Sequence, residues 1–587
     1  MEKRWVSKPA VDQNDVEHLA ETLNINELLA SLLIQRGIKT FDQAKSFFRP
    51  NLESLYDPFR MKDMNRAIER IEKAIQNNQK ILIYGDYDVD GITSVAMIYS
   101  FLKKFYSNID YYIPDRYAEG YGISYKGINF AAHNNVSLVI ALDCGIKAVE
   151  KIDYANKLNI DFIICDHHTP EKSLPNAVAV LDPKRNDCPY PFKELSGCGV
   201  GFKMLQAFSR TNHIDPEELY PFLDLVAVSI ASDIVPLIDE NRILTFFGLK
   251  QLNRNPSTGL KAIIDVSGLG DKNHKIVVED IVFRIGPRIN ATGRLESGKN
   301  AVDLLITTNK KKADNMAKKV NSCNDERKNI DRNITQHAIK MLSNEPGFQE
   351  KKSTVLYNSG WHKGVVGIVA SRMIEIYYRP TIILTASNGL ATGSARSVPG
   401  FDIYEALNQC SDLIENFGGH TYAAGLTLDI NNINSFKKRF ESIVEQNITE
   451  EQLIPHLEID SEIEFKDITE KFFNILKQFQ PFGPQNLAPI FVARDVKDTG
   501  DARLVGANKE HIKLALMQKD KPGKIFPAIA FQQANHYSSI HKGKTFDICF
   551  SVEENNFRGN RCLQLNIKDI KIKKTTDGFK TSGAPES

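Results

Sequence analysis

Three aspartates stand at alternate positions soon after a short apolar run. Residues 81–83 read Ile-Leu-Ile, and Asp86, Asp88 and Asp90 follow within the next seven positions. Carboxylates this close together repel one another, which raises their pKa values. A divalent cation removes that cost, and carboxylate oxygens suit Mg²⁺ or Mn²⁺. The run does not match a calcium-binding EF-hand loop, because Met97 stands where the glutamate ligand is required.

The same order, an apolar segment followed by polar side chains, occurs three more times. Asp143 follows residues 138–142, Asp166-His167-His168 follows residues 160–165, and Asp233 follows the helix-like run 223–230. Any one of these aspartates could simply cap a helix, but four sites at one edge of a sheet favour a metal centre. Two ions about 3.5–4 Å apart, sharing a carboxylate, activate water at a phosphorus centre. A histidine among the aspartates shifts the preference toward Mn²⁺.

Apolar runs alternate with amphipathic segments between residues 80 and 210. We expect strands at 80–84, 109–113, 138–142, 160–165 and 177–181, with helices such as 93–105 and 147–158 between them. Short apolar strands separated by helices are typical of a parallel sheet covered on both faces. Ligands of such sheets bind at the carboxyl ends of the strands, where the four acidic sites fall.

The rest of the chain divides by pattern. Residues 215–345 look mostly helical and end in a long charged helix at about 310–342, which reads as a connector. A second α/β unit follows at about 352–450, with strands expected at 354–357, 381–384 and 425–428. Short β-type runs at 489–492, 512–517, 546–552 and 563–572 predict a small β-barrel. The polar tail from Thr575 is expected to be disordered.

The amino-acid composition excludes some classes of protein but does not by itself indicate a function. No run approaches the ~20 apolar residues of a membrane span, and no apolar signal segment follows the N-terminus. The eight cysteines include no Cys-x-x-Cys pair, which favours a reduced cytoplasmic protein. The net charge of +1 does not indicate a nucleic-acid binder, although a local basic channel remains compatible with it.

Taken together, these motifs resemble the DHH phosphoesterase superfamily, and within it the bacterial exonucleases that degrade single-stranded DNA from the 5′ end. The resemblance covers about residues 50–570. It includes the stretches 286–294 (Gly-Pro-Arg-Ile-Asn-Ala-Thr-Gly-Arg), 360–367, 393–397, 417–420 and 481–486. It implies an α/β fold: a parallel-sheet DHH domain, a long helix, a second α/β domain of the DHHA1 type and a C-terminal OB-fold.

The resemblance also implies roles for the metal-site residues. Asp88, Asp143, His167 and Asp233 would form one metal site, and Asp86 would join a bridging Asp143 at the second, for two Mn²⁺ or Mg²⁺ ions. His168 would contact the scissile phosphate or the attacking water, and Asp166 would orient the imidazoles. Asp90 is expected to support the ligands rather than to bind metal. Some relatives carry His where this chain has Tyr84, so the second site could lack one ligand.

Substrate-binding residues follow from the same resemblance. They are Arg116, Arg288, Asn290, Arg294, Ser394, Arg396 and His420. Arginine forks match phosphate oxygens bidentately, and the small residues beside Arg288 and Arg294 would let a phosphate approach. A surface ion pair is the alternative for any single arginine. Residues 293–300 nearly spell an ATP-binding loop, but Asn300 replaces the metal-binding Ser or Thr and no strand precedes it.

The implied domains are an N-terminal helical segment 1–50, a catalytic domain 51–214, a helical region 215–345, a DHHA1-like domain 346–452, an OB-fold 453–574 and a tail 575–587. On the OB-fold, Arg494, Arg503, Lys509, Lys513, Phe526 and Phe531 are candidates for binding a strand, with core packing favoured for each phenylalanine. The implied partners are single-stranded DNA, a single-strand-binding protein and a RecQ-type helicase, with no membrane and a monomeric chain acting in the cytoplasm, at the nucleoid during repair.

Two other functions stay open at this point. One is a phosphodiesterase of nano-RNA or cyclic dinucleotides, which would share the first two domains. The OB-like region and the long connector favour a polymeric substrate instead. The other is a catalytically inactive relative of the kind found in replication complexes, which the complete set of aspartates and histidines argues against.

Overall fold

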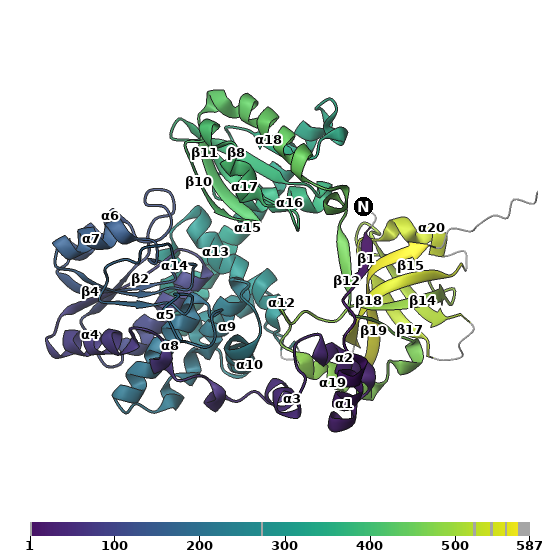
Figure 1. The fold of residues 1–587 in the computed structure, drawn as a ribbon, viewed down its shortest axis with the longest axis horizontal. Coiled ribbons are helices and arrows are strands. Elements are labelled where there is room, and N and C mark those ends of the chain that lie inside the picture. The colour runs from purple at the N-terminus through teal and green to yellow at the C-terminus, as the bar shows by residue number, and fades with distance from the viewer. Residues whose placement is uncertain (1–2, 272–273, 520–523, 541–543, 558–559, 573–587) are drawn as a thin grey trace, which may run out of the picture. The chain divides into compact units, whose positions relative to one another are not determined.

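The computed structural model describes residues 3–271, 274–519, 524–540, 544–557 and 560–572. Its contacts divide the chain into two compact units (Figure 1). The large unit holds residues 50–453 and 481–486, and the small unit holds 1–49, 454–480 and 487–587. The finer domain boundaries expected from the sequence stay a prediction. The tail from residue 575 lies outside the described residues. No helix among the described residues is long and apolar enough to cross a membrane.

The large unit begins with the expected parallel sheet. Its order is β3 (Ile109–Tyr112), β2 (Lys80–Gly85), β4 (Val136–Leu142), β5 (Asp161–Cys165) and β6 (Ala179–Leu181), and every pairing is parallel. Because successive side chains alternate between faces, Ile81 and Ile83 join one core cluster and Leu82 and Tyr84 another. Helices α4 (Met64–Gln76), α5 (Val89–Leu102) and α8 (Gly197–Thr211) cover the first face, and α6 (Tyr125–His133) and α7 (Val149–Lys157) the second (Figure 1).

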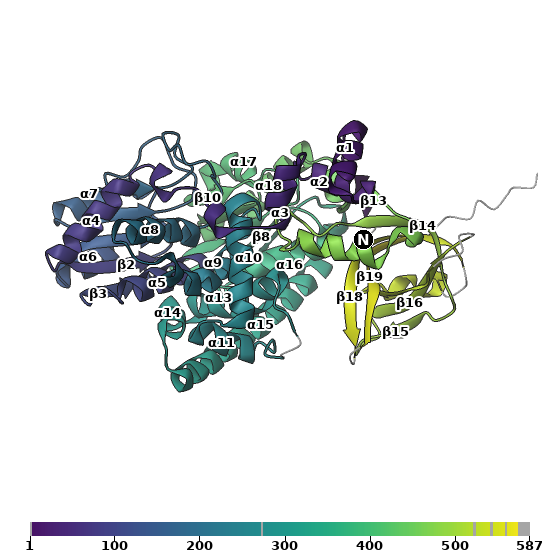
Figure 2. The same ribbon diagram turned by 90° about the horizontal axis from the view of Figure 1, so that it is seen from below.

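A helical layer continues from this sheet. It contains α9 (Leu223–Ser232), α10 (Asp239–Arg254), α11 (Thr258–Val266), α13 (Gly286–Leu295) and α14 (Gly298–Ile306), and ends in α15 (Lys310–Ser343). The expected long helix is therefore confirmed. Ala313, Ala317 and Val320 recur at helical spacing on its buried side, while most of its lysines are exposed. It packs against α11, α13 and then α16 (Val366–Tyr377) (Figure 2).

The second sheet has the order β10 (Asn416–His420), β11 (Ala423–Leu428), β9 (Leu390–Arg396), β8 (Thr381–Ser387) and β7 (Thr354–Tyr357). Only β7 and β8 are parallel, so this sheet is mixed. The sequence predicted β7, β8 and β11 but missed β9 and β10, whose glycines dilute the apolar pattern. Gly393 is required on β9, since a Cβ there would lie 2.0 Å from the carbonyl oxygen of Ile383.

The small unit contains the expected barrel. Its sheet order is β13 (Ser461–Glu462), β14 (Phe491–Asp498), β18 (Phe546–Phe557), β19 (Asn560–Ile572), β17 (Phe526–Ala530), β16 (His511–Gln518) and β15 (Arg503–Val505), and a β14–β16 pairing closes it. Phe526 is buried as expected, but Phe531 is 52% exposed, so its assignment to the core was wrong. Arg494 pairs with Glu462 and Asp547, whereas Arg503 and Lys513 are exposed cross-strand neighbours.

The N-terminal segment of the small unit is not wholly helical. It begins with β1 (Arg4–Ser7), which pairs in parallel with β12 (His456–Ile459), before α1 (Gln13–Leu23), α2 (Glu27–Ile34) and α3 (Phe41–Phe48). The expectation of a helical segment was wrong for these four residues, because their strand depends on a partner more than 450 positions away.

The crossing of α9 and α10 is testable, because Gly248 lets the helices touch. A Cβ at residue 248 would lie 2.2 Å from the Leu223 carbonyl oxygen and 2.5 Å from the Ala227 methyl. We expect Gly248→Ala to lower the free energy of unfolding by about 1–3 kcal/mol through overpacking. Denaturant titration measures this. The exposed neighbour substitution Lys250→Ala should stay within about 0.5 kcal/mol, and an equal effect of both would contradict the packing argument.

Candidate metal centre and phosphate-binding site

Strand register places three of the predicted aspartates side by side. Gly85 pairs with Leu142, and Leu142 pairs with Cys165, at the carboxyl ends of β2, β4 and β5. The next residues are Asp86, Asp143 and Asp166, so one edge of the sheet carries all three. The ladder continues one step further, since the Asp143 amide donates to the Cys165 carbonyl at 2.9 Å. All three aspartates are almost completely buried.

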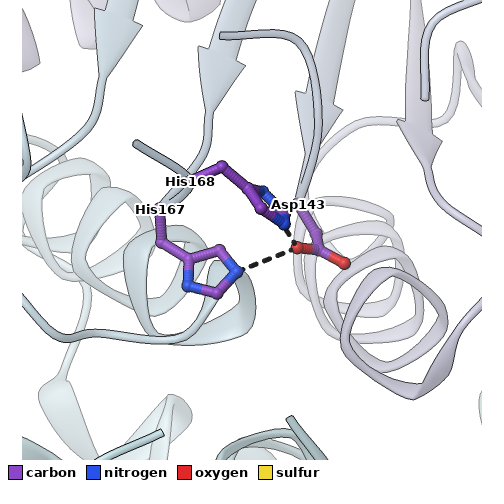
Figure 3. Close-up of side chains that lie close together, drawn as sticks. All are labelled: Asp143, His167 and His168. Atoms are coloured by element: carbon purple, nitrogen blue, oxygen red, sulfur yellow. Dashed lines mark hydrogen bonds and ion pairs between the residues drawn. The ribbon is translucent and has the colours of Figure 1, made fainter. Parts of the chain in front are cut away.

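The two histidines after β5 converge on Asp143 (Figure 3). Nε2 of His167 lies 3.1 Å from Oδ1 of Asp143, and Nδ1 of His168 lies 4.0 Å from the same oxygen. His167 also approaches Asp233, at 3.6 Å, and Asp90, at 3.7 Å. Two groups among the described residues can therefore hold a cation: Asp143, His167 and His168, and Asp90, His167 and Asp233.

Asp166 holds His168 in place and does not itself point at the other aspartates. Its Oδ1 lies 2.7 Å from Nδ1 of His168 and accepts the backbone amides of His167 and His168. Its Oδ2 accepts the amide of Ile146. The structure thus places Asp166 as an orienting residue for His168. It does not do so for the His167 ring, whose buried Nδ1 has no hydrogen-bond partner among the described residues.

The carboxylates destabilise one another in the absence of a cation. Burial, together with the negative charges of Asp90 and Asp88, raises the pKa of Asp143 well above its usual value. Burial and Asp88 do the same to Asp86, and burial with Asp90 and Asp88 raises the pKa of Asp233 to about 8. Oδ2 of both Asp86 and Asp143 is buried without a partner. Unpaired buried oxygens in a cluster of carboxylates fit a divalent cation with oxygen and imidazole ligands.

Asp90 lies next to His167 and is itself held by hydrogen bonds from α8 and α9. Its oxygens accept the amides of Gly197 and Cys198, at 2.6 and 2.8 Å, and the Ser229 hydroxyl at 2.7 Å. Both amides belong to the first turn of α8, so a helix N-terminus stabilises the buried charge. Asp88, which is half-buried, caps α5 through the Gly91 amide. These contacts agree with a supporting role for Asp90.

Tyr84 does not replace a metal-binding histidine. Its side chain is 1% exposed, and its hydroxyl donates to the Gly122 carbonyl at 3.0 Å and accepts from the Ser124 amide at 3.2 Å. Burial raises the pKa of this phenol, so it stays neutral. The carboxylate cluster is therefore assembled without a ligand from residue 84.

Three of the four predicted arginines, Arg116, Arg294 and Arg396, lie close enough to act on one another's charge. Burial, with the charges of Arg116, Arg327 and Arg396, lowers the pKa of Arg294 to about 10, while Asp88 opposes the shift. Arg294 donates to the Gly364 carbonyl at 3.0 Å, and its own carbonyl accepts the Tyr117 hydroxyl. No ion pair with a carboxylate satisfies Arg116, Arg294 or Arg396 within the part of the chain that the structure describes.

Ser394 and Arg396 lie together on β9, and both are close to the first turn of α16. The Arg396 guanidinium donates to the Ser394 hydroxyl at 2.6 Å. A Cβ at Gly367, in the first turn of α16, would lie 3.2 Å from Arg396 and 3.3 Å from Ser394. Val365 caps this helix without a side-chain hydrogen bond, and the amides of a helix N-terminus favour a nearby anion.

The remaining predicted substrate residues differ in position. His420 ends β10 and is largely exposed. Its pKa is lowered by partial burial and by the charges of Lys147 and His168, so it lies within electrostatic reach of His168. Asn290 is half-buried on α13. Arg288 is 8% exposed and donates to Asn321 and to the Arg284 carbonyl. The structure does not bring Arg288 into the group around Arg294.

Three residues at the site carried no signal in the sequence. Tyr121 lies 3.3 Å from Nε2 of His168 through its hydroxyl. Lys184 acts electrostatically on His167, Asp233 and His420. Arg327, on α15, acts on Arg294. Each stands in a loop or on a charged helix, where the sequence pattern looks like ordinary surface.

Comparison with known families defines the class of protein. Residues 80–230 match the DHH family, N-terminal domain, and residues 350–446 match the DHHA1 domain. The chain is therefore a DHH-type phosphoesterase. Residues 459–569 match the RecJ OB domain. A single-stranded-DNA-specific exonuclease RecJ of Bacillus subtilis is 37% identical over 575 residues, covering 97% of this chain and 71% of the relative. The chain belongs to the RecJ family of exonucleases, as the sequence resemblance predicted.

Other relatives agree with this assignment. RecJ of Haemophilus influenzae is 32% identical over 535 residues, covering 88% of this chain and 92% of the relative. A crystal structure of RecJ with Mn²⁺ from Thermus thermophilus aligns with a TM-score of 0.83 at 24% identity, over 97% of this chain and 80% of that one. A crystal structure of exonuclease RecJ bound to manganese aligns with a TM-score of 0.59 at 29% identity. The alignment covers 68% of this chain and 98% of that one.

The raised pKa of Asp233 predicts how metal binding depends on pH. Asp233 must lose its proton to ligate, so Mn²⁺ affinity should rise between pH 6 and pH 8, by up to about tenfold per pH unit. In the metal-free protein, the same shift makes stability fall as pH rises from the unfolded-state pKa of about 4 to about 8. Calorimetric titration in buffers of different ionisation enthalpy measures the affinity and the released protons.

Asp233→Asn is the matched control for this titration. The variant should bind Mn²⁺ more weakly and should lose the part of the pH dependence and of the proton release that Asp233 contributes. An affinity of the unaltered chain that stays constant across this range would contradict the assignment of a protonated Asp233.

Proposed function

We propose that this chain hydrolyses single-stranded DNA from its 5′ end and releases 5′-mononucleotides with the help of two divalent ions, Mn²⁺ or Mg²⁺. The observation that carries the proposal is the position of Arg294, which lies under the influence of three other arginines and of Asp88 at once. A cationic group without carboxylate partners thus adjoins an anionic metal site within the same unit. An anion-binding pocket beside a hydrolytic centre suits a terminal phosphate followed by a phosphodiester.

The ions would be held by residues already described. Asp88, Asp143, His167 and Asp233 would ligate one ion, and Asp86 would join Asp143 at the other. When bound, such ions lower the pKa of a water molecule and stabilise negative charge on the phosphate oxygens. Asp166 orients His168 by holding its Nδ1, which leaves Nε2, beside the Tyr121 hydroxyl, to contact the phosphate or the attacking water.

The polarity of the reaction would come from the arginine group. Arg396, Ser394 and the amides of α16 offer donors to a terminal 5′-phosphate, and Arg116 and Arg294 offer charge. A phosphate dianion anchored there would set the next phosphodiester at the metal ions. Arg503 and Lys513, exposed side by side on the barrel, are suited to binding the phosphate backbone of a single strand.

The wider setting is also part of the proposal. A role in DNA recombination and repair in the cytoplasm, as a monomer, would bring the chain together with a single-strand-binding protein and a RecQ-type helicase. Digestion of matched single- and double-stranded oligonucleotides labelled at either end tests the central claim. Early release of a labelled mononucleotide only from 5′-labelled single strands supports it. Activity confined to dinucleotides would favour a small-substrate phosphodiesterase instead.

Removing the shared ligand should separate catalysis from binding. We expect Asp143→Ala to slow cleavage by at least about 10³-fold, the scale of losing a catalytic group. Binding of an uncleavable single strand, measured by fluorescence anisotropy, should change by less than a factor of about three. Asp153→Ala, at an exposed aspartate of α7, is the control and should behave like the unaltered chain. Substantial turnover by Asp143→Ala would rule out a bridging role.

Removing one arginine should affect substrates according to their 5′ end. Arg396→Ala should lower kcat/KM by about 10- to 100-fold for 5′-phosphorylated oligonucleotides, the value of a hydrogen bond to a charged group. For oligonucleotides with a 5′-hydroxyl, the same variant should lower kcat/KM by less than about threefold. Arg439→Ala, which breaks a surface pair with Asp412, should change neither. Equal losses on both kinds of end would contradict the anchoring role.

A further inference from the structure

One loop at the metal-site edge is held by hydrogen bonds that could not be predicted from its sequence. Residues 120–124 connect the region after β3 to α6 and carry Tyr121. The Gly122 amide donates to Oδ1 of Asp86 at 3.1 Å. The Tyr84 hydroxyl bonds both the Gly122 carbonyl and the Ser124 amide from inside the sheet. The loop is therefore tied to a metal-site aspartate and to a buried strand residue at once.

This attachment brings the Tyr121 hydroxyl to the centre of the site. Its oxygen lies 3.2 Å from the Asp143 carbonyl and 3.3 Å from Nε2 of His168. A hydroxyl carries one hydrogen and two lone pairs. The hydrogen is donated to the Asp143 carbonyl, so a lone pair is left to accept from Nε2 of His168. The ring meets those of His168 and Tyr87 edge-on, at 5.9 and 6.1 Å between centroids.

Tyr121 nevertheless remains open to solvent. The residue is 49% exposed, unlike the neighbouring Asp86, Asp143 and Asp166. Arg116 stacks over Tyr87 at 4.9 Å, so a cation adjoins the aromatic pair. A hydroxyl, an imidazole nitrogen and a cation are thus linked through the neighbouring rings of Tyr121, His168 and Tyr87. A phosphate oxygen is the ligand that all three would recognise.

We propose that Tyr121 is a further catalytic residue, whose hydroxyl exchanges its bond to the Asp143 carbonyl for a hydrogen bond donated to a non-bridging oxygen of the scissile phosphate. Tyr84 is its positioning residue, acting through the Gly122 and Ser124 backbone. The inference rests on the proposed function, since it assumes that a phosphodiester occupies this edge of the sheet. It adds a protein donor on the side of His168 that Asp166 does not occupy.

Tyr121→Phe tests the proposal, because it removes the hydroxyl and keeps the ring contacts with Tyr87 and His168. We expect kcat on a 5′-phosphorylated single strand to fall by about 100-fold, the loss of one donor to transition-state charge. KM and the affinity for an uncleavable strand should change by less than about threefold. A variant with unchanged kcat would overturn the proposal.

A phosphorothioate at the first linkage separates substrate contact from a structural role. Sulfur accepts hydrogen bonds poorly, so the unaltered chain in Mn²⁺ should cleave one diastereomer more slowly than the all-oxygen substrate. Tyr121→Phe should show a smaller slowing with that diastereomer, because the hydrogen bond is already lost. The same slowing in both enzymes would mean that the hydroxyl only shapes the site, and would refute the contact.

Two further variants complete the design. Tyr84→Phe should lower kcat by about tenfold, the scale of one lost hydrogen bond, but should cost nothing more when added to Tyr121→Phe. Additive losses would show that Tyr84 does not act through Tyr121. Tyr125→Phe is the control, since Tyr125 is exposed and its ring packs on Tyr154. If the unaltered chain fails to degrade the 5′-labelled strand, the proposed function fails; if it succeeds, only Tyr121 is under test.

Discussion

The mutual repulsion of buried carboxylates is the constraint on which the rest of this structure depends. Asp86, Asp143 and Asp166 are adjacent because β2, β4 and β5 are parallel and in register, so no small movement of one strand can separate them. Burial raises the energy of each charge, and the neighbouring charges raise it further. The protein offsets this cost with fixed dipoles and imidazoles, and leaves two carboxylate oxygens unpaired for a cation.

The dipoles come from helices that also form the core. The first turn of α8 binds Asp90, and Asp88 caps the first turn of α5. Gly197 is needed in that turn because a Cβ would lie 2.7 Å from the Asp143 side chain. Packing of α5 and α8 on one face of the sheet therefore serves the metal site directly. A change in that packing would alter the distances among the ligands as well as the stability of the domain.

A second group of charges balances the first. Arg294 on α13, Arg327 on α15 and Arg396 on β9 come from three elements, and the long α15 runs past both α13 and α16. Arg294 and Arg396 have no ion pair with a carboxylate within the described residues, and burial lowers the pKa of both, so they too are held at a cost by the surrounding fold. An anionic substrate that reaches both groups would relieve both kinds of repulsion, which links substrate binding to the electrostatics of the free protein.

Local pattern was enough to predict much of this arrangement. Apolar runs ending in acidic residues predicted β2, β4, β5 and the aspartates after them, because strand period and strand-end chemistry are short-range properties. The long α15 followed from its charge pattern and spacing. By contrast, β9 and β10 are rich in small residues, and β1 acquires its strand conformation only by pairing with β12. Such strands form only by pairing with other strands, which can lie far away in the sequence and outside any short segment used for prediction.

The sequence by itself determined the class of chemistry and predicted the candidate metal-binding side chains, since ligand type follows from residue type. Only the tertiary structure decided which of them meet: Asp166 orients His168 but not His167, Arg288 turns inward to Asn321, and Arg327 joins Arg294. It also placed Tyr121 between His168 and Asp143, through a loop that Tyr84 holds. The physical reason is that side-chain contacts between distant segments depend on strand register and helix packing, which are properties of the whole fold.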